Sequence, residues 1–252
     1  MKNMVFRNDP VPVVSVIIPA LNERRTIAAV IKEAFKVHPH TEVIVVANGS
    51  TDGTHKIAAR QGAIVIYEKE PLGHDVGRYV GAQVAKGDVL LFIDGDMIIP
   101  SFQLVPFVRA VLTGVDIALN NYLGPVHRAP VHRVILSKHV LNMMLRRPDL
   151  RGSSLTTVPH AISRRALEEI GAQSLAIPPL AQAIAESKAL KIKAVHLIQV
   201  GRLNPRRVKR SISDPLEPLV TGDHVEAISW LLQQRGPRAG FTDLHRKRDK
   251  VR

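Results

Sequence analysis

The sequence predicts an α/β fold whose mostly parallel sheet is flanked by helices. Over the first 100 or so of its 252 residues, short runs rich in β-branched residues alternate with amphipathic segments. Each strand-like run ends in a turn of Gly, Pro, Asn or Asp, which is the pattern of consecutive βαβ units. With 45% hydrophobic and 23% charged residues, the composition is that of a globular protein.

The first half is expected to contain four strands separated by three helices. A β-branched run closed by Pro19 forms the first strand, and Asn22 and Glu23 open the helix that follows. A polar turn at residues 48–53 separates the second strand from a short helix. The predicted strands cover residues 13–18, 42–46, 63–67 and 89–93, and the predicted helices cover residues 22–37, 54–60 and 77–86.

The second half has a less regular pattern. Its predicted helices cover residues 100–112, 131–146, 163–170, 179–190 and 223–234, and its predicted strands cover residues 115–120 and 191–200. Residues 201–213 are expected to form a basic loop, and residues 241–252 a basic tail. Because no repeat or low-complexity linker interrupts the chain, we expect a single domain over residues 1–252, with a first half (1–126) and a second half (127–240).

Composition limits the compartment and the kind of site. The chain has no cysteine, which excludes disulfides and zinc–thiolate sites and favours a reducing cytoplasm. No segment approaches the roughly 20 apolar residues of a membrane span. We therefore expect a cytoplasmic protein that is soluble or peripheral to the inner face of the membrane, and the sequence is compatible with a homo-oligomer.

The net charge of +13 lies entirely in the second half. Residues 1–126 carry 12 Lys and Arg against 12 Asp and Glu, whereas residues 127–252 carry 23 against 10. A neutral half joined to a basic half predicts an anionic partner for the second half, such as a phosphate, a nucleic acid or a lipid surface. Nucleic acid is disfavoured, because aromatic residues make up only 4% of the chain and offer few stacking platforms.

Asp94-Gly95-Asp96 is the most informative motif of the chain. It follows the apolar run Val89 to Ile93, which reads as a buried parallel strand, so both carboxylates should lie at the carboxyl edge of the sheet. Residues two apart in an extended backbone point the same way, so the two carboxylates can converge on one hard cation. The glycine between them allows close approach to the backbone. By itself the motif is also compatible with an ordinary turn.

Three motifs at the ends of successive strands together resemble the family 2 glycosyltransferases. They are residues 16–23 (VIIPALNE), residues 45–54 (VVANGSTDGT), and Ala85-Lys86-Gly87-Asp88 leading into Asp94-Gly95-Asp96. The chain also resembles the retaining glucosyl-3-phosphoglycerate synthases, in the spacing from Gly73 to Asp94 and in the block 133–150. The resemblance implies a GT-A fold with a Rossmann-like sheet. It also implies transfer of a sugar from a nucleotide diphosphate sugar, UDP favoured over GDP, with Mn²⁺ or Mg²⁺ as cofactor.

The resemblance assigns roles by position. Asp94 and Asp96 would bind the metal, and together with His160 they form the implied catalytic set. Asn48 stands where many relatives have an aspartate that reads the base, and an amide can both donate and accept there. The residues implied to bind the nucleotide sugar are Pro19, Ala20, Leu21, Glu23, Asn48, Gly73, His74, Arg78, Asp94 and Gly95.

The acceptor is expected to bind beside the donor, and to be anionic or held at a surface. His160 follows Pro159 and precedes a predicted helix, a position from which its side chain would either project into the cleft or cap that helix. Asp75 is expected to cap the helix that follows it. The residues predicted to contact the acceptor or a phosphate are Arg133, Thr157, His160, Arg206 and Arg207.

Two departures from the family bear on mechanism. Inverting members carry an acidic pair where this chain has residues 176–182, a segment with no carboxylate. We therefore expect retention of configuration, with the leaving phosphate taking the acceptor proton, unless Asp149, Asp214 or Asp223 supplies a base. The synthases also carry a late histidine as a metal ligand, and this chain offers Asn204 there, with His196 upstream.

The function predicted from the sequence is therefore a metal-dependent glycosyltransferase that acts on an acceptor hydroxyl. The metal would neutralise the charge that develops on the departing diphosphate. The alternative is a catalytically idle regulator that binds sugar nucleotides on the same fold. The missing base and the sequence Ala47-Asn48 favour this alternative, whereas the intact Asp94-Gly95-Asp96 opposes it.

Overall fold

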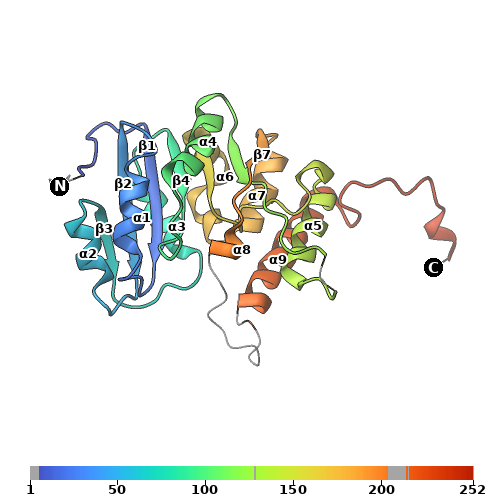
Figure 1. Cartoon of the computed structure of the whole chain (residues 1–252). Helices are drawn as coiled ribbons and strands as arrows, with labels where there is room; N and C mark the ends of the chain where they lie inside the picture. The colour runs from blue at the N-terminus through green and yellow to red at the C-terminus, as the bar shows by residue number, and fades with distance from the viewer. Residues whose placement is uncertain (1–5, 128, 204–213, 215, 252) are drawn as a thin grey trace.

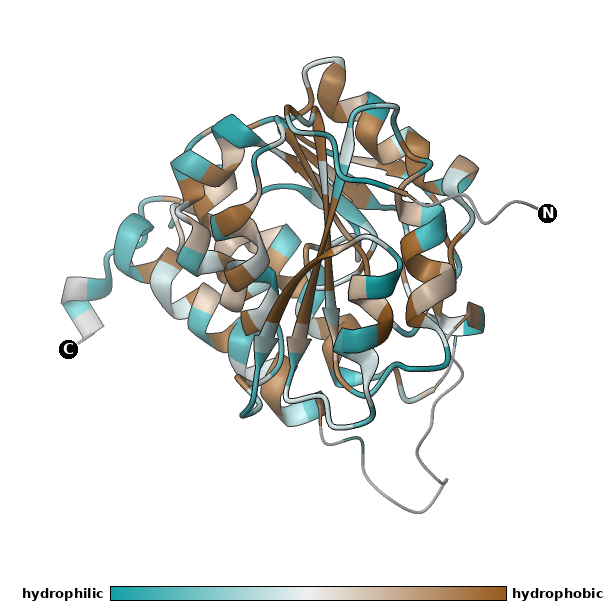
Figure 2. Ribbon diagram, turned by 90° about the vertical axis from the view of Figure 1, so that its left-hand side faces the viewer, coloured by the Kyte–Doolittle hydropathy of each residue, from teal (hydrophilic) through white to brown (hydrophobic). Residues whose placement is uncertain are grey.

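A computed structural model of the chain describes residues 6–127, 129–203, 214 and 216–251. In this part of the chain one mixed sheet of seven strands is covered by helices on both faces (Figures 1 and 2). The strands are β1 (Val14–Ala20), β2 (Thr41–Asn48), β3 (Ile64–Glu68), β4 (Val89–Phe92), β5 (Ile117–Asn120), β6 (His160–Ser163) and β7 (Ile192–His196). Their order across the sheet is β3-β2-β1-β4-β6-β5-β7.

The expected parallel arrangement is confirmed for the first half. β1 pairs in parallel with both β2 and β4, and β2 pairs in parallel with β3. β6 then runs antiparallel to β4 and to β5, and β7 is parallel to β5. Because β1, β2 and β4 point the same way, the loops after their carboxyl ends meet at one edge of the sheet.

Helices connect the strands and cover the sheet (Figure 1). The α-helices are α1 (Ile27–Ala34), α2 (Thr54–Arg60), α3 (Val76–Val84), α4 (Ser101–Leu112), α5 (Arg133–Met144), α6 (Arg164–Ile170), α7 (Pro178–Ser187), α8 (Val200–Leu203) and α9 (Leu216–Arg235). Three short 3₁₀ helices are η1 (Pro148–Leu150), η2 (Ala172–Ala176) and η3 (Arg248–Val251). None of the described helices is long and apolar enough to cross a membrane.

The first helix is shorter than the sequence predicted. It begins at Ile27 rather than at Asn22, whose backbone has a left-handed φ of 58°. The Asn22 side chain accepts a hydrogen bond from the backbone of Thr51 (2.9 Å), in the loop after β2. The backbone N–H groups of residues 22–24 also donate to side chains of residues 50–54, so the loop after β2 holds these residues outside the helix.

The second half contains three further differences. The sequence analysis missed β6, because four residues are too few to show a strand period. α9 begins at Leu216 rather than at residue 223, and the Asp214 carboxylate accepts a hydrogen bond from the Leu216 backbone (3.0 Å) at its start. α8 occupies the beginning of the predicted basic loop, whose residues 204–213 lie outside the described part of the chain.

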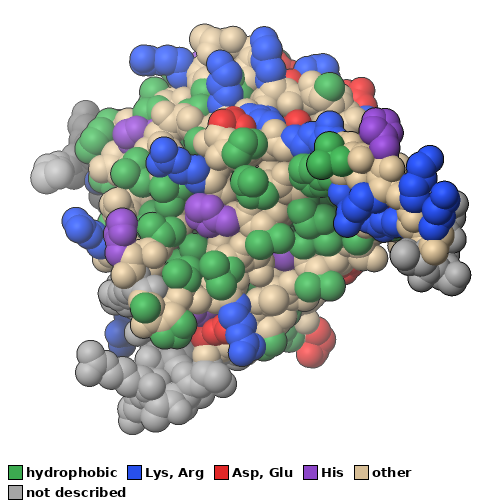
Figure 3. Space-filling view, turned by 90° about the vertical axis from the view of Figure 1, so that its right-hand side faces the viewer, with side chains coloured by type: hydrophobic (Ala, Val, Ile, Leu, Met, Phe, Trp, Pro, Cys, Tyr) green, Lys and Arg blue, Asp and Glu red, His purple; other side chains and the backbone are tan. Residues whose placement is uncertain are grey.

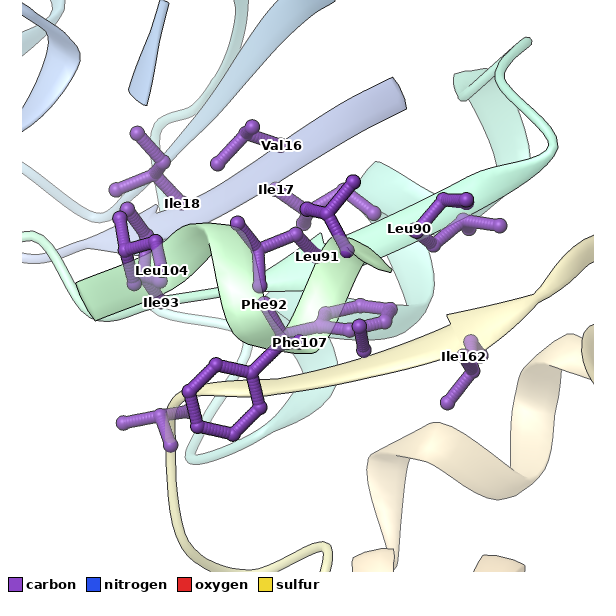
Figure 4. Close-up of a cluster of buried hydrophobic side chains, with 14 of the residues drawn as sticks. Val16, Ile17, Ile18, Leu90, Leu91, Phe92, Ile93, Leu104, Phe107 and Ile162 are labelled. Carbon is purple, nitrogen blue, oxygen red and sulfur yellow. The ribbon is translucent and has the colours of Figure 1, made fainter. Parts of the chain in front are cut away.

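The core lies on both faces of the central strands. All four residues of β4 are buried, and Leu104 and Phe107 of α4 are fully buried in the same cluster (Figure 4). A second, smaller cluster includes Leu141 of α5 and Leu231 of α9. The large core therefore fixes the end of β4, and the small one fixes α5 against α9.

Candidate active site

The loops after β1 and β2 are tied to each other by short polar contacts. The backbone N–H of Asn22 donates to Ser50 Oγ (3.1 Å), and that of Glu23 donates to Thr54 Oγ1 (2.9 Å). Ser50 Oγ in turn donates to the carbonyl of Ala20 (3.1 Å). The predicted pocket residues 19–23 are thus held on a rigid wall built from two loops.

Asp94-Gly95-Asp96 follows β4 and packs against the end of β1. The Gly95 N–H donates to the Pro19 carbonyl (3.2 Å), and the Thr26 hydroxyl donates to the Gly95 carbonyl (2.7 Å). A Cβ at Gly95 would lie 3.0 Å from the Ala20 Cβ, so this position has little room for a side chain. The glycine therefore serves close packing against β1 and leaves the two carboxylates on either side of the contact.

Both carboxylates line a cleft of about 380 Å³ at the carboxyl edge of the sheet. The structure brings together the whole nucleotide-sugar set predicted from the sequence. The predicted residues that line this cleft are Pro19, Ala20, Leu21, Glu23, Asn48, Gly73, His74, Arg78, Asp94, Gly95 and Asp96.

A buried ion pair stands beside the carboxylates. Arg78 Nη1 lies 2.7 Å from Asp75 Oδ1, Arg78 Nη2 lies 3.7 Å from Asp94 Oδ1, and His74 Nε2 lies 3.5 Å from Asp75 Oδ2. Asp75 stands at the N-cap position of α3, but its side chain makes no capping hydrogen bond, so the expected cap is wrong. Burial raises the pKa of Asp94, and the Arg78 cation partly opposes this rise.

The side-chain amide of Asn48 forms hydrogen bonds with the loop that leads to α3. Its Nδ2 donates to the Gly73 carbonyl (3.0 Å), and its Oδ1 accepts from the Leu72 N–H (2.5 Å). The side chain therefore shapes the wall of the cleft through residues 72 and 73.

A second cavity of about 300 Å³ adjoins the first, and His74 and Leu216 line both. Lys138 of α5 lines this second cavity and donates from Nζ to Thr157 Oγ1 (2.6 Å). Burial, together with repulsion from Arg78, lowers the pKa of Lys138 to about 8. Among the described residues no carboxylate forms an ion pair with Lys138, although Asp214 and Glu217 line the same cavity.

Residues 15–171 match the family model described as Glycosyl transferase family 2. The chain belongs to this family. The family predicted from the sequence is confirmed.

Proteins similar to this chain include glucosyl-3-phosphoglycerate synthases, as the resemblance in the sequence indicated. The glucosyl-3-phosphoglycerate synthase of Mycobacterium tuberculosis (strain CDC 1551 / Oshkosh) is 35% identical over 116 residues, covering 42% of this chain and 36% of that protein. The low-salt glycan biosynthesis hexosyltransferase Agl6 of Haloferax volcanii is 32% identical over 146 residues, covering 55% of this chain and 34% of that protein. The chain thus spans about a third of the length of the curated relatives it matches.

The fold is that of the GT-A glycosyltransferases. A crystal structure of the Mycobacterium tuberculosis synthase, in complex with Mn²⁺, UDP and phosphoglyceric acid, superposes with a TM-score of 0.62 at 24% identity. It covers 92% of this chain and 80% of the synthase. The predicted fold class is confirmed.

His160 does not project into the cleft, contrary to the prediction. It belongs to β6, is 1% exposed, stacks on Phe92 with ring centroids 5.0 Å apart, and its Nδ1 lies 3.1 Å from the Thr157 carbonyl. Burial, with repulsion from Arg78, lowers the pKa of His160 to about 3, so the imidazole is neutral. Pro159 directly precedes the strand β6, so His160 does not cap a helix.

The other predicted acceptor residues are scattered. Arg133, at the start of α5, is 81% exposed on its side chain and lies 3.5 Å from Glu217. Thr157 is buried and contacts the second cavity only through Lys138. Arg206 and Arg207 lie outside the described residues.

The residues present fit a divalent cation at Asp94 and Asp96. Mg²⁺ and Mn²⁺ take oxygen ligands, commonly one or two carboxylates plus phosphate oxygens. No group of three or more His, Asp or Glu within the described residues could hold a metal ion alone. His196, one of the two candidates for a further metal ligand, lies in β7 against the Phe107 ring. The other candidate, Asn204, is outside the described part of the chain. Donor phosphate and water would complete the shell.

The candidate bases differ in position. Asp149 is paired with Arg147 at 2.7 Å, and Asp214 lines the second cavity. Burial raises the pKa of Asp223, and repulsion from Asp75 adds to this rise. In the segment without carboxylates, Gln182 is fully buried and donates to Asn142 Oδ1 (2.7 Å), so it is a core residue.

Sequence reasoning missed Lys138 and the pairing of Asp75 with Arg78. The helical spacing contained a signal for Lys138, since Val134, Ile135 and Leu141 place it on the inward side of α5. The signal for the pair was the spacing of three residues between opposite charges at the start of a helix.

Proposed function

We propose that this glycosyltransferase moves a hexosyl group from a UDP-sugar to an acceptor hydroxyl in the cytoplasm, with Mn²⁺ or Mg²⁺ bound at Asp94 and Asp96. The observation that carries the proposal is the meeting of Asp94, Asp96 and Arg78 in one cleft with the wall at residues 19–23. Support comes from the Mycobacterium tuberculosis synthase, whose structures hold UDP with Mn²⁺ or Mg²⁺.

The two carboxylates would bind the cation, and Arg78 would contact the diphosphate directly. A cation at Asp94 and Asp96 would supply Lewis-acid stabilisation of the departing phosphate. Arg78, held in place by Asp75, would donate to phosphate oxygens with its remaining N–H groups. A cation bound there would lower the pKa of Asp94 again, because it would offset the burial that raises this pKa.

The second cavity is the proposed acceptor site. It shares His74 with the donor cleft, so an acceptor there would lie beside the departing phosphate. Lys138 would bind an anionic group of the acceptor, and the synthase structure with phosphoglyceric acid is support for an acceptor of that charge. Neutral His160, buried behind Thr157, would hold the Thr157 backbone rather than take a proton.

The test is calorimetric titration of UDP and GDP with and without Mn²⁺. Asp96→Ala should weaken Mn²⁺-dependent UDP binding by at least about tenfold, because a direct metal contact is lost. The matched control is Asp88→Ala, an exposed carboxylate in the turn before β4. Equal UDP affinity of Asp96→Ala and the parent would refute the metal site.

The anomeric configuration of the product tests whether a side chain acts as the base. We expect the first-formed product to retain the donor anomer, as measured by nuclear magnetic resonance. An inverted product would contradict this, and loss of that activity in Asp214→Asn would then identify Asp214 as the base, because it lines the acceptor cavity.

A second candidate is an idle regulator that binds sugar nucleotides without transferring sugar. Residues 176–182 favour it, because they lack the carboxylate that inverting members use. A screen of nucleotide sugars for hydrolysis and transfer distinguishes the two. Tight UDP-sugar binding with no turnover under any metal would support the regulator.

A further inference from the structure

The outward face of α5 carries apolar side chains that are about half exposed. Leu136, Val140 and Met143 are 50%, 49% and 57% exposed. Successive residues turn by about 100° around a helix, so these three fall within one arc of roughly 60°. Leu141 and Leu145, on the opposite side, are buried against α9. The helix is therefore apolar on two faces, of which only one is used inside the molecule.

The segment after α9 continues this surface. Arg146, just beyond α5, donates to the Gly240 carbonyl and lies with its Cζ 5.4 Å from the centre of the Phe241 ring. Phe241 and Leu244 are 45% and 80% exposed. We call Leu136, Val140, Met143 and Phe241 the docking face. Figure 3 shows this side of the molecule, where hydrophobic side chains gather between groups of Lys and Arg.

Positive charge surrounds the docking face. Arg133, at the start of α5, is 81% exposed on its side chain, and Arg146 lies just beyond the end of this helix beside Gly240. Residues 235–248 contain five Lys and Arg against one Asp or Glu. The single acid, Asp243, is neutralised by Arg246 at 2.5 Å and Arg248 at 2.6 Å. An apolar centre with a basic rim is the pattern of surfaces that lie in the headgroup region of a membrane.

We propose that the docking face binds the surface of an anionic lipid bilayer. The apolar side chains enter the interface, and the basic side chains contact the lipid phosphates. A second copy of the chain fits this face less well, because a two-fold interface would bring two basic rims together. This binding goes beyond sugar transfer and does not depend on it.

The experiment is co-sedimentation of the full chain with vesicles of phosphatidylcholine, alone or with about 30% phosphatidylglycerol. We expect binding to the anionic vesicles only, and weaker binding at 1 M salt, where the Debye length falls to about 3 Å. The variant Leu136→Ser, Val140→Ser, Met143→Ser should bind at least about tenfold more weakly. The matched control, Val84→Ser, Phe102→Ser, Leu112→Ser, removes three exposed apolar side chains of α3 and α4 and should bind as the parent does.

A second variant keeps the test valid if the triple variant does not fold. Arg246→Gln with Lys247→Gln leaves α5 untouched and should weaken binding about fivefold per charge. Equal binding to neutral and anionic vesicles, or equal loss in the triple variant and its control, would overturn the proposal. The proposal would also be overturned if the parent did not bind vesicles and formed a dimer that the triple variant converts to a monomer. Light scattering after gel filtration measures the oligomeric state.

Discussion

At the scale of single residues, Asn48 is bound to the backbone of the cleft wall. Its amide donates to Gly73 and accepts from Leu72, so both of its functional ends already have partners. In Asn48→Asp the donor to Gly73 is lost and two oxygens face each other. We expect a loss of about 1–3 kcal/mol in the free energy of unfolding and weaker UDP binding, with an unchanged preference for UDP over GDP. Urea denaturation and calorimetry measure the two effects.

The control for Asn48→Asp is Asn121→Asp at an exposed position after β5, which should be close to neutral. If Asn48 instead reads the base, the variant would change the preference between UDP and GDP and leave stability as in the parent. That outcome would contradict the structural role.

Lys138 makes the stability of the protein depend on pH. Its pKa is about 8 in the folded state against 10.5 for a free lysine, chiefly because of burial. Between these values the unfolded chain binds more protons than the folded one, so the contribution of Lys138 to stability rises from about pH 8 to 10.5. We expect the unfolding free energy of the parent, minus that of Lys138→Met, to rise by about 1–3 kcal/mol between pH 7.5 and 10.5.

Chemical denaturation at several pH values measures this difference for Lys138. Lys56→Met, at an exposed position of α2, is the control and should give no such trend. A flat difference for Lys138→Met as well would mean that water reaches the ammonium group and that the cavity is open.

The sequence predicted the residues that line the first cleft well and those that line the second cavity poorly. Asp94 and Asp96 could be found because a buried strand ends directly before them, and this depends on local pattern alone. The helical spacing indicated only that Lys138 lies on the inward side of α5. The surroundings of Lys138 and His160 could not be predicted, because they come from segments far away in the chain. For His160 the deciding contact is Phe92, across an antiparallel pairing that four residues do not reveal.

At the scale of elements, α3 depends on a close approach to β1. A Cβ at Gly81 would lie 2.5 Å from Ile17 Cγ2 and 3.3 Å from Val46 Cγ2. Gly81→Ala should therefore destabilise the protein by about 1–3 kcal/mol through overpacking. Gly222→Ala in α9 is the matched control, because nothing lies within 4 Å of its Cβ, and it should stabilise by about 0.5–1 kcal/mol.

Thermal or urea unfolding of the two glycine variants measures the comparison. Equal effects of Gly81→Ala and Gly222→Ala would mean that α3 can shift away from β1. The nucleotide affinity of Gly81→Ala is then the second readout, since α3 carries Arg78 into the cleft.

Elements whose pattern is local were predicted to within a few residues, and those that depend on distant partners were not. β2, α2 and α4 follow from runs of apolar residues with clear turns on either side. The predicted start of α1 was wrong, because contacts with the loop after β2 hold those residues outside the helix. The first two turns of α9 were missed because Pro218 and Gly222 disfavour a helix in the sequence. Packing of α9 against α5 and α7 overrides that preference.

At the scale of the molecule, the boundary between the neutral and the basic half does not divide the fold. β4 belongs to the first half by sequence, yet it pairs with β6 of the second half in the same sheet. β5 pairs with β6 and β7, so every strand is linked to its neighbour through one ladder. The charge asymmetry therefore divides the sequence but not the sheet.

A single sheet predicts a single cooperative unfolding transition. Trp230 of α9 is the only tryptophan and lies in the second half, whereas far-ultraviolet circular dichroism follows the whole chain. Gly81→Val, in the first half, should shift the midpoints of both signals by the same amount, because β4 and β6 transmit the loss of stability across the sheet. A fluorescence midpoint that stays with the parent while the circular dichroism midpoint falls would show two independent units, and would make the donor half separable from the acceptor half.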